Sequence, residues 1–279
     1  METMDPDIVF GPIAELMSDP TVEEIWINSP QRIFVARNGK SQLINLVLTS
    51  DSVRQLIDRA LIWSGRRLDL SQPFVDARLP DGSRLHVAIP EITAEHWAVN
   101  IRKHLMRQKS ILDLAAMGVM SEEIAAELSS AVKSGMNILV SGGTQAGKTT
   151  LLNALIAEIP RTQRVITIEE VFELQPMVPD LVQMQTRSAN LQGTGAISLR
   201  QLIKEALRMR PSRIVVGEVR GQEVSDLLLA LNTGHKGSAT TIHADNAASV
   251  PTRIEALGLL AGLPREAIHA QMFSAFDVV

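Results

Sequence analysis

The stretch SGGTQAGKTTLLNAL, residues 141–155, decides the fold expected for this chain. A short apolar run, MNILV (136–140), precedes it, and apolar residues at helical spacing follow in TLLNALIAEI (150–159). The glycine-rich segment is therefore expected on a turn between a strand and a helix. This is the setting of a phosphate-binding loop, or P-loop, in an α/β fold.

Gly142, Gly147, Lys148 and Thr149 match the pattern G-x-x-x-x-G-K-[ST]. Glycines permit positive φ, so successive backbone N–H groups can point at one anion, and a helix beginning near Lys148 adds its positive end. We expect Lys148 to bind the β- and γ-phosphates of ATP and Thr149 to bind Mg²⁺. The remaining residues of the expected cradle are Gly143, Thr144, Gln145, Ala146 and Thr150.

Composition limits the alternatives. The chain has 279 residues, of which 45% are hydrophobic, enough for two domains with apolar cores. It has no cysteine, which excludes disulfides and thiolate metal sites. No apolar run reaches membrane-spanning length, and the first ten residues lack the pattern of a secretory signal. The net charge of −4 argues against a broad nucleic-acid-binding surface, so no nucleic-acid partner is expected.

Residues 1–105 are expected to form an α+β domain on an antiparallel sheet. EEIWINS (23–29) and RIFVARN (32–38) alternate apolar and polar residues, and Asn38-Gly39 predicts a hairpin leading into SQLINLVL (41–48). Ser50 is a candidate cap for a helix that ends at Gly65. Further strands are predicted in VDARL (75–79), SRLHVAI (83–89) and WAVNIRK (97–103).

Residues 106–279 are expected to form the P-loop domain, an α/β core with a mostly parallel sheet. A helix from Ser121 to Gly135 is followed by buried-type strands in RVITIEE (164–170), SRIVVGEV (212–219) and SATTIHA (238–244), with helices between them in 198–209 and 221–234. The linker KHLMRQKSILDL (103–114) is interpreted as a solvated connector. The final SAFDVV (274–279) is typical of the start of a strand, so a truncated C-terminus is expected.

Hydrolysis of ATP needs an acid at a strand end to activate water. Glu218 is expected just past the C-terminal end of the strand Ile214–Val216, the edge at which parallel sheets bind ligands. Glu169, Glu170 and Glu173 follow another strand, and three acids there suggest a bound cation. His235 and His243, with the adjacent Thr240 and Thr241, are typical of a sensor of the γ-phosphate.

Four motifs now stand in order along the second domain: SGGTQAGKTT (141–150), TIEEVFEL (167–174), RIVVGEVRG (213–221) and NTGHKGSATTIHA (232–244). They resemble the Walker A motif, Asp box, Walker B motif and His box of the ATPases of type II and type IV secretion machines. In the first domain, VDARLPDGSRLHVAIP (75–90) and NIRKH (100–104) resemble most the Tad/Flp-pilus branch, the CpaF-type ATPases. The traffic ATPases of conjugation and type IV secretion are close relatives with weaker resemblance.

This resemblance implies a RecA-like P-loop core and a Mg²⁺-dependent ATPase that forms a hexameric ring. It implies a cytoplasmic location at the inner face of the membrane, with inner-membrane platform proteins as partners. Glu218 and His243 are then catalytic, and His235 binds the nucleotide. Arginines of the first domain, Arg78, Arg84 and Arg102, are implied to reach the phosphates. The Asp box of the family carries Asp after its first Glu, whereas this chain has Glu170, so either Glu169 or Glu170 is expected to serve the metal.

The function expected first is a motor that powers assembly of a Tad/Flp-type pilus or protein secretion. Three alternatives stay open. One is a traffic ATPase of conjugation or type IV secretion, another is a DNA-translocating ATPase, and the last is a platform that binds ATP without turning it over. The acidic balance of charge speaks against DNA translocation, and Glu218 speaks against the inactive platform.

Overall fold

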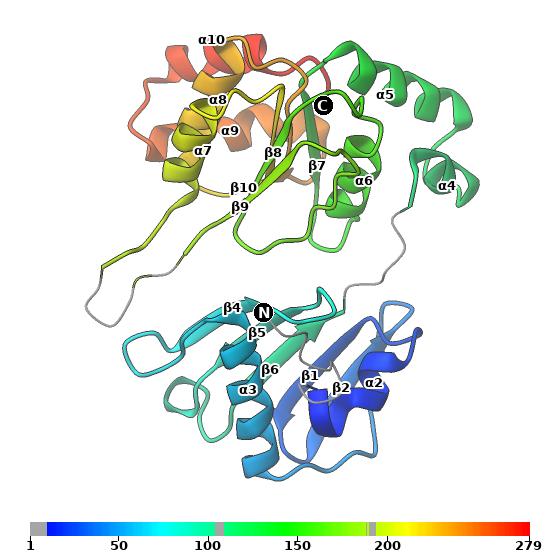
Figure 1. Ribbon diagram of the computed structural model, residues 1–279, viewed down its shortest axis with the longest axis vertical. Coiled ribbons are helices and arrows are strands. Elements are labelled where there is room, and N and C mark those ends of the chain that lie inside the picture. Colours follow the sequence, from blue (N-terminus) through cyan, green and yellow to red (C-terminus); the bar gives the residue numbers. More distant parts are fainter. Residues whose placement is uncertain (1–9, 104–108, 188, 190–193) are drawn as a thin grey trace. The chain divides into compact units, whose positions relative to one another are not determined.

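The computed structural model describes residues 10–103, 109–187, 189 and 194–279 (Figure 1). The chain divides into two compact units, Met1–Met106 and Arg107–Val279, called here the first and the second unit. Within the described ranges, no helix is long and apolar enough to cross a lipid bilayer.

The first unit is built on a six-stranded antiparallel sheet with the order β3-β2-β1-β6-β5-β4. The strands are β1 (Glu24–Ser29), β2 (Arg32–Arg37), β3 (Lys40–Leu43), β4 (Phe74–Arg78), β5 (Arg84–Ala88) and β6 (Ala98–Arg102). The helical elements are η1 (Gly11–Ile13), α2 (Ala14–Ser18), α3 (Ser50–Ser64) and η2 (Pro90–Ile92).

Alternation along these strands gives the sheet one buried face and one open face. Ile25, Ile27, Val87, Val99 and Ile101 are at most 1% exposed and pack in one core with α3. The alternate residues of the same strands lie on the opposite face, where most are half-buried or exposed. The open face is the one that carries the polar and charged side chains, as the period of two predicts.

Two details of the first unit differ from the sequence expectations. Thr49, not Ser50, caps α3, because its Oγ1 accepts the N–H of Ser52 at 3.1 Å. The strand after the Asn38-Gly39 turn covers only Lys40–Leu43, all of whose residues are exposed. At the edge of the sheet, β3 has one neighbouring strand only, and the chain leaves the ladder once the hairpin pairing is complete.

The second unit contains a five-stranded sheet with the order β7-β11-β10-β8-β9, and every neighbouring pair is parallel. Its strands are β7 (Ile138–Gly142), β8 (Val165–Glu169), β9 (Leu181–Gln185), β10 (Arg213–Val219) and β11 (Ala239–His243). Its helical elements are α4 (Ile111–Ala116), α5 (Glu122–Ser134), α6 (Lys148–Ile156), α7 (Leu199–Leu207), α8 (Glu223–Asn232), η3 (Ala247–Ser249), α9 (Val250–Leu260) and α10 (Arg265–Ala275).

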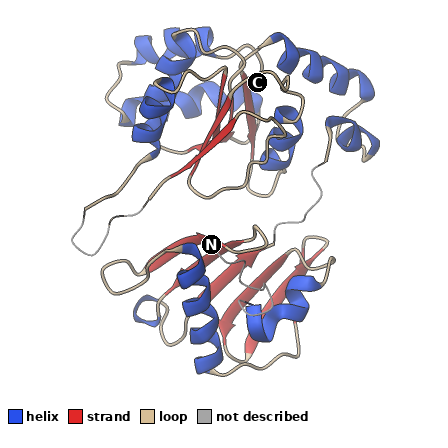
Figure 2. Cartoon of the chain, viewed as in Figure 1, coloured by secondary structure: helices blue, strands red, loops and turns tan. Residues whose placement is uncertain are grey.

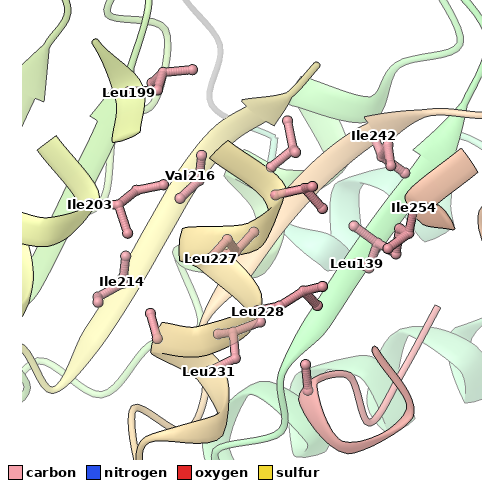
Figure 3. Close-up of a cluster of buried hydrophobic side chains, with 14 of the residues drawn as sticks. Leu139, Leu199, Ile203, Ile214, Val216, Leu227, Leu228, Leu231, Ile242 and Ile254 are labelled. Atoms are coloured by element: carbon pink, nitrogen blue, oxygen red, sulfur yellow. The ribbon is translucent and has the colours of Figure 1, made fainter. Parts of the chain in front are cut away.

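Helices cover both faces of this sheet (Figure 2). On one face, Leu139, Ile214, Val216 and Ile242 of the strands pack against α7, α8, α9 and α10 (Figure 3). On the other face, Ile138, Val140, Val165, Val215 and Ala239 pack against α4, α5 and α6. Because the inner strands β8 and β10 are buried on both faces over most of their length, their sequences are nearly continuous apolar runs. The predicted fold class, a mostly parallel α/β unit preceded by a smaller α+β unit, is confirmed.

Three parts of the second unit were not predicted correctly. The linker interpretation fails for 111–114, because Ser110 and Asp113 form a capping box that starts α4. Strand β9 has no counterpart among the predicted elements, since LVQMQ (181–185) lies at the sheet edge and mixes polar with apolar residues. The terminal segment expected to begin a strand makes one parallel bridge only, between Val278 and Ile138.

Candidate nucleotide-binding site of the second unit

The P-loop connects β7 to α6, as the sequence predicts. Gln145 (φ 61°) and Gly147 (φ 86°) both adopt left-handed backbone conformations, so the chain curls between the strand and the first helical turn. A Cβ at Gly142 would lie 3.1 Å from the Cβ of Ala146, so any larger residue would require Ala146 to shift. The residues from Gly143 to Gly147 are exposed. Such a curl, followed by a helix N-terminus, suits a polyphosphate.

Strand register brings side chains of β10 and β11 to this loop. Strand β11 lies next to β7, and His243 is opposite Gly142. His243 Nδ1 lies 3.3 Å from Nζ of Lys148, which also donates a hydrogen bond to Gly143 O at 2.7 Å. His243 Nε2 lies 2.7 Å from Oε1 of Glu218 on β10. Because an ammonium can only donate, Nδ1 is the acceptor in its contact with Lys148. The other ring nitrogen, Nε2, lies close to the carboxylate of Glu218 but makes no hydrogen bond with Oε1.

Glu218 belongs to β10 and does not follow it. The prediction that the strand ends before Glu218 is wrong, because Val219 still pairs with Ile242 of β11. The ladder between β10 and β11 has an irregularity between Val216 and Val219, at the height of Glu218. This irregularity accompanies the placement of Glu218 at the loop edge, with His243 beside it.

Arg220 completes the cluster and was not predicted as a site residue. Its Nε and Nη2 lie 2.7 and 2.5 Å from Oε2 of Glu218, and its Nη1 lies 3.3 Å from Oε2 of Glu170. Burial lowers the pKa of Arg220, but the hydrogen bond and charge of Glu218, with the charges of Glu170 and Glu173, raise it above the usual value. The spacing Glu218-x-Arg220 was the available signal, since extended backbone places residues i and i+2 on one face.

Glu169 is the last residue of β8 and does not follow the strand as predicted, whereas Glu170 follows it, and the two side chains have different surroundings. Glu169 is 4% exposed, and its Oε1 accepts the N–H groups of Glu173 and Leu174 at 2.7 and 2.9 Å. Glu170 is exposed and its carboxylate faces Arg220. Asn153 of α6 also fixes this segment, because its amide accepts from Gln175 N and donates to Glu173 O. Glu169 thus shapes the loop, and Glu170 is the carboxylate at the surface of the cluster.

His235 does not join the cluster. It precedes β11, whose first residue Ala239 pairs with Ile138 at the start of β7, whereas His243 is opposite Gly142 at the end. The length of β11 alone separates these edges by about 13 Å, at 3.3 Å per residue. His235 Nδ1 lies 3.3 Å from Ala230 O instead. The structure therefore does not bring His235 to the P-loop of its own chain.

The two threonines expected to sense phosphate are structural in this conformation. Thr240 and Thr241 are each 1% exposed within β11. The hydroxyl of Thr241 donates to Gly217 O on the neighbouring β10 at 2.8 Å. This hydrogen bond connects β11, which carries His243, to β10 at Gly217, the residue before Glu218.

In the first unit, the three expected arginines lie in one row across the open face of the sheet. Arg78 on β4 is opposite Arg84 on β5, and Arg84 is opposite Arg102 on β6. Glu24 on β1 is next in the row and lies 3.8 Å from Nε of Arg102. Directly opposed residues share a face of an antiparallel sheet. Residues separated by up to 24 positions in the sequence thus form one cationic row.

A family model described as "Type II/IV secretion system protein" matches residues 8–279. The chain belongs to this family. It is 40% identical over 276 residues to a putative conjugal transfer protein of Mycobacterium tuberculosis, covering 96% of this chain and 78% of that protein. It is 33% identical to the probable conjugal transfer protein TrbB of Sinorhizobium fredii, covering 94% and 79% of the two chains.

Solved structures of the family agree with this fold. The VirB11 ATPase of the Brucella suis type IV secretion system, solved in complex with sulphate, is 27% identical with a TM-score of 0.51, covering 98% of this chain and 91% of that one. The pilus retraction motor PilT with bound ADP has a TM-score of 0.65 at 20% identity, covering 95% and 76%, which supports the fold alone. The chain is a secretion-family ATPase, and the enzyme class expected from the four motifs is confirmed.

Proposed function

We propose that this chain is the ATP-hydrolysing motor of a type IV secretion or conjugal transfer machine. The observation that carries the proposal is the aligned set Lys148, His243 and Glu218, which joins the P-loop to an acid through one imidazole. The relatives reported above are named for conjugal transfer and type IV secretion, which supports that alternative over the Tad/Flp-pilus motor expected first.

In this proposal, each residue of the cluster has a separate role in hydrolysis. The P-loop amides and Lys148 bind the phosphates, and Glu218 takes the proton of the attacking water. His243 holds Glu218 on one side and senses through Nδ1 whether Lys148 has moved to a phosphate. Each of these groups is already within hydrogen-bond reach of its neighbour in the chain.

The side chains present also fit a Mg²⁺ ion bound together with ATP. In the described ranges, no group of three or more acidic, cysteine or histidine side chains could hold a metal. Mg²⁺ bound mainly by phosphates and waters needs only one or two protein ligands, so Thr149 in the first turn of α6 and Glu170 through water suffice. When bound, the ion would neutralise phosphate charge and align the γ-phosphate.

The proposal includes a homohexameric ring that associates peripherally with the cytoplasmic face of the inner membrane through platform proteins of the machine. The arginine row of the first unit would supply further cations to the phosphates, from the same chain or from a neighbouring subunit. Guanidinium groups suit this role because they are planar, multidentate and always charged. No nucleic acid is included, in keeping with the net charge of −4.

Steady-state ATPase assays of Glu218→Gln, with Lys148→Ala beside it, test the enzymatic part. Glu218→Gln should bind ATP with near wild-type affinity and lose about 10²–10⁴ in kcat, because the amide keeps the shape but cannot act as a base. Lys148→Ala should lose binding itself. A Glu218→Gln variant with wild-type turnover would refute the assignment of the base.

The cellular part is tested with the same substitution in the native gene. The proposal expects loss of DNA or protein transfer between cells, with surface pili retained. If pili disappear while transfer is otherwise intact, the Tad/Flp-pilus motor is the correct function. Adding DNA to the purified protein should not raise turnover. Stimulation by DNA would instead favour a DNA translocase.

A further inference from the structure

The conformation of the loop after β10 places the side chain of Arg220 next to Glu218 on that strand. Glu223, the first residue of α8, is 9% exposed, and its Oε1 accepts the N–H groups of Arg220 and Gly221 at 2.7 Å each. A Cβ at Gly221 would lie 3.1 Å from Oε2 of Glu223, so the close turn requires glycine or a shift of the carboxylate. A buried carboxylate that binds two backbone amides fixes the backbone from which Arg220 projects.

From this anchored position Arg220 contacts two carboxylates. Two of its nitrogens converge on Oε2 of Glu218, and the third faces Oε2 of Glu170. The other oxygen of Glu218, Oε1, faces His243. Oε2 of Glu218 is therefore held by the loop after β10, whereas Oε1 is buried next to the imidazole on β11 without a hydrogen bond to it.

The arrangement restricts the carboxylate of Glu218 to one orientation. A glutamate with three side-chain torsions loses conformational freedom when two nitrogens of one guanidinium hold one of its oxygens and the other oxygen is buried. Arg220 also separates two negative charges, Glu218 and Glu170, which would otherwise repel each other across the ends of β10 and β8. Its role is thus distinct from that of His243, which connects Glu218 to Lys148.

We propose that Arg220 is a positioning residue for Glu218: it holds Oε2 so that the carboxylate stays beside His243 and ready to accept the proton of water. This inference rests on the proposed function, in which Glu218 is the base. Arg220 acts through Glu218 and not directly on ATP, so its loss should lower kcat and leave nucleotide binding intact.

Kinetics of five variants test the proposal: Arg220→Ala, Arg220→Lys, Glu218→Gln, the double variant of Glu218→Gln with Arg220→Ala, and Arg208→Ala as control. Arg208 is an exposed arginine of the same unit whose ion pair is with Glu205, one helical turn away on α7 and its cap. Thermal melting and binding of a fluorescent ATP analogue are measured for each, so that misfolding is recognised.

Arg220→Ala should lower kcat about tenfold, a part of the 10²–10⁴ attributed to the base itself, with the KM for ATP nearly unchanged. Arg220→Lys should recover part of the loss, because a point charge can engage Glu218 but cannot make the converging contacts of a guanidinium. In single-turnover assays the double variant should be no slower than Glu218→Gln alone, since a group that acts through Glu218 has nothing left to position. Arg208→Ala should match the wild type.

Three outcomes would overturn the proposal: a normal kcat in Arg220→Ala, a loss confined to KM or nucleotide affinity, or a further loss in the Glu218→Gln background. If Arg220→Ala has a lowered melting temperature but a normal kcat per folded molecule, its kcat counts as normal and the proposal is overturned. If Glu218→Gln itself is fully active, the base assignment fails. If Glu218→Gln is inactive and Arg220→Ala is normal, the base assignment stands and only the inference about Arg220 falls.

Discussion

At the residue scale, one imidazole lies between Lys148 of the P-loop and Glu218, the residue proposed to activate water. His243 accepts from Lys148 through Nδ1 and faces Glu218 through Nε2, at 3.3 and 2.7 Å. If Lys148 moves on nucleotide binding, its contact with His243 changes, and this would alter the position of His243 beside Glu218. The other histidine of the same motif, His235, lies toward the opposite edge of the sheet, where its Nδ1 is 3.3 Å from Ala230 O.

His243→Ala should lower turnover about tenfold with little change in nucleotide affinity. The expected size is that of one lost hydrogen bond to a charged group, about 1.5 kcal/mol. His235→Ala removes the same kind of side chain from the same motif and should keep nearly wild-type turnover. Equal losses in the two variants, measured by steady-state ATPase assay, would mean that the position beside Glu218 has no special importance.

At the element scale, the buried guanidinium of Arg213 connects the start of β10 to the loop that leads into β11. Arg213 is 2% exposed, donates to Gly237 O at 3.0 Å, and contacts Gln163 Oε1 at 2.5 Å. Burial lowers the pKa of Arg213. Because β10 carries Glu218 and β11 carries His243, this contact helps to fix the register on which the cluster at the other edge depends.

Gly237→Ala tests this element-level contact, with Gly234→Ala as its matched control. Both glycines have positive φ, 75° and 101°, so both substitutions should cost about 1–2 kcal/mol of backbone strain. A Cβ at Gly237 would also lie 1.5 Å from Nη1 of Arg213, whereas the one at Gly234 meets nothing within 4 Å. Chemical denaturation should show a clearly larger loss for Gly237→Ala. Equal losses would show that Arg213 adjusts without cost.

At the scale of the whole molecule, the proposal expects the first unit to supply cations to the phosphates in addition to Lys148 of the second unit. The first unit offers the row Arg78, Arg84 and Arg102 across three adjacent strands. Replacement of Arg84 or Arg102 by Ala should therefore reduce turnover severely, and Lys should restore little of it, because an ammonium lacks the bidentate geometry. Normal hydrolysis in both Ala variants would mean that the first unit has only a mechanical role and supplies no catalytic arginine.

Mixing experiments test whether an arginine reaches the phosphates of a neighbouring subunit. If it does, activity should rise steeply with protein concentration, and mixing inactive Glu218→Gln protein with inactive Arg84→Ala protein should restore part of the turnover. Such rings contain subunit pairs in which one chain supplies the base and the other the arginine. Mixtures that stay inactive at concentrations where rings form would place the arginine and the base in the same chain.

The sequence by itself determined those local elements whose signal is contiguous, though not α4 or β9. The strand–loop–helix around Gly142 and Lys148 is contiguous, so its signal needs no distant partner. The caps of α5 behave likewise: Ser121 accepts the N–H of Ile124, and Gly135 ends the helix at φ 85°. The nearly continuous apolar runs of β8 and β10 also predicted a sheet that is buried on both faces.

Only the tertiary structure decided which of several similar residues meet. His243 rather than His235 joins Lys148 because β11 runs parallel to β7 in one register. Glu170 rather than Glu169 faces Arg220, because Glu169 is turned inward to the amides of the following loop. The pairing of β4, β5 and β6 aligns three arginines that are scattered in the chain. Register, strand order and side-chain direction arise from packing between distant segments, and no local pattern encodes them.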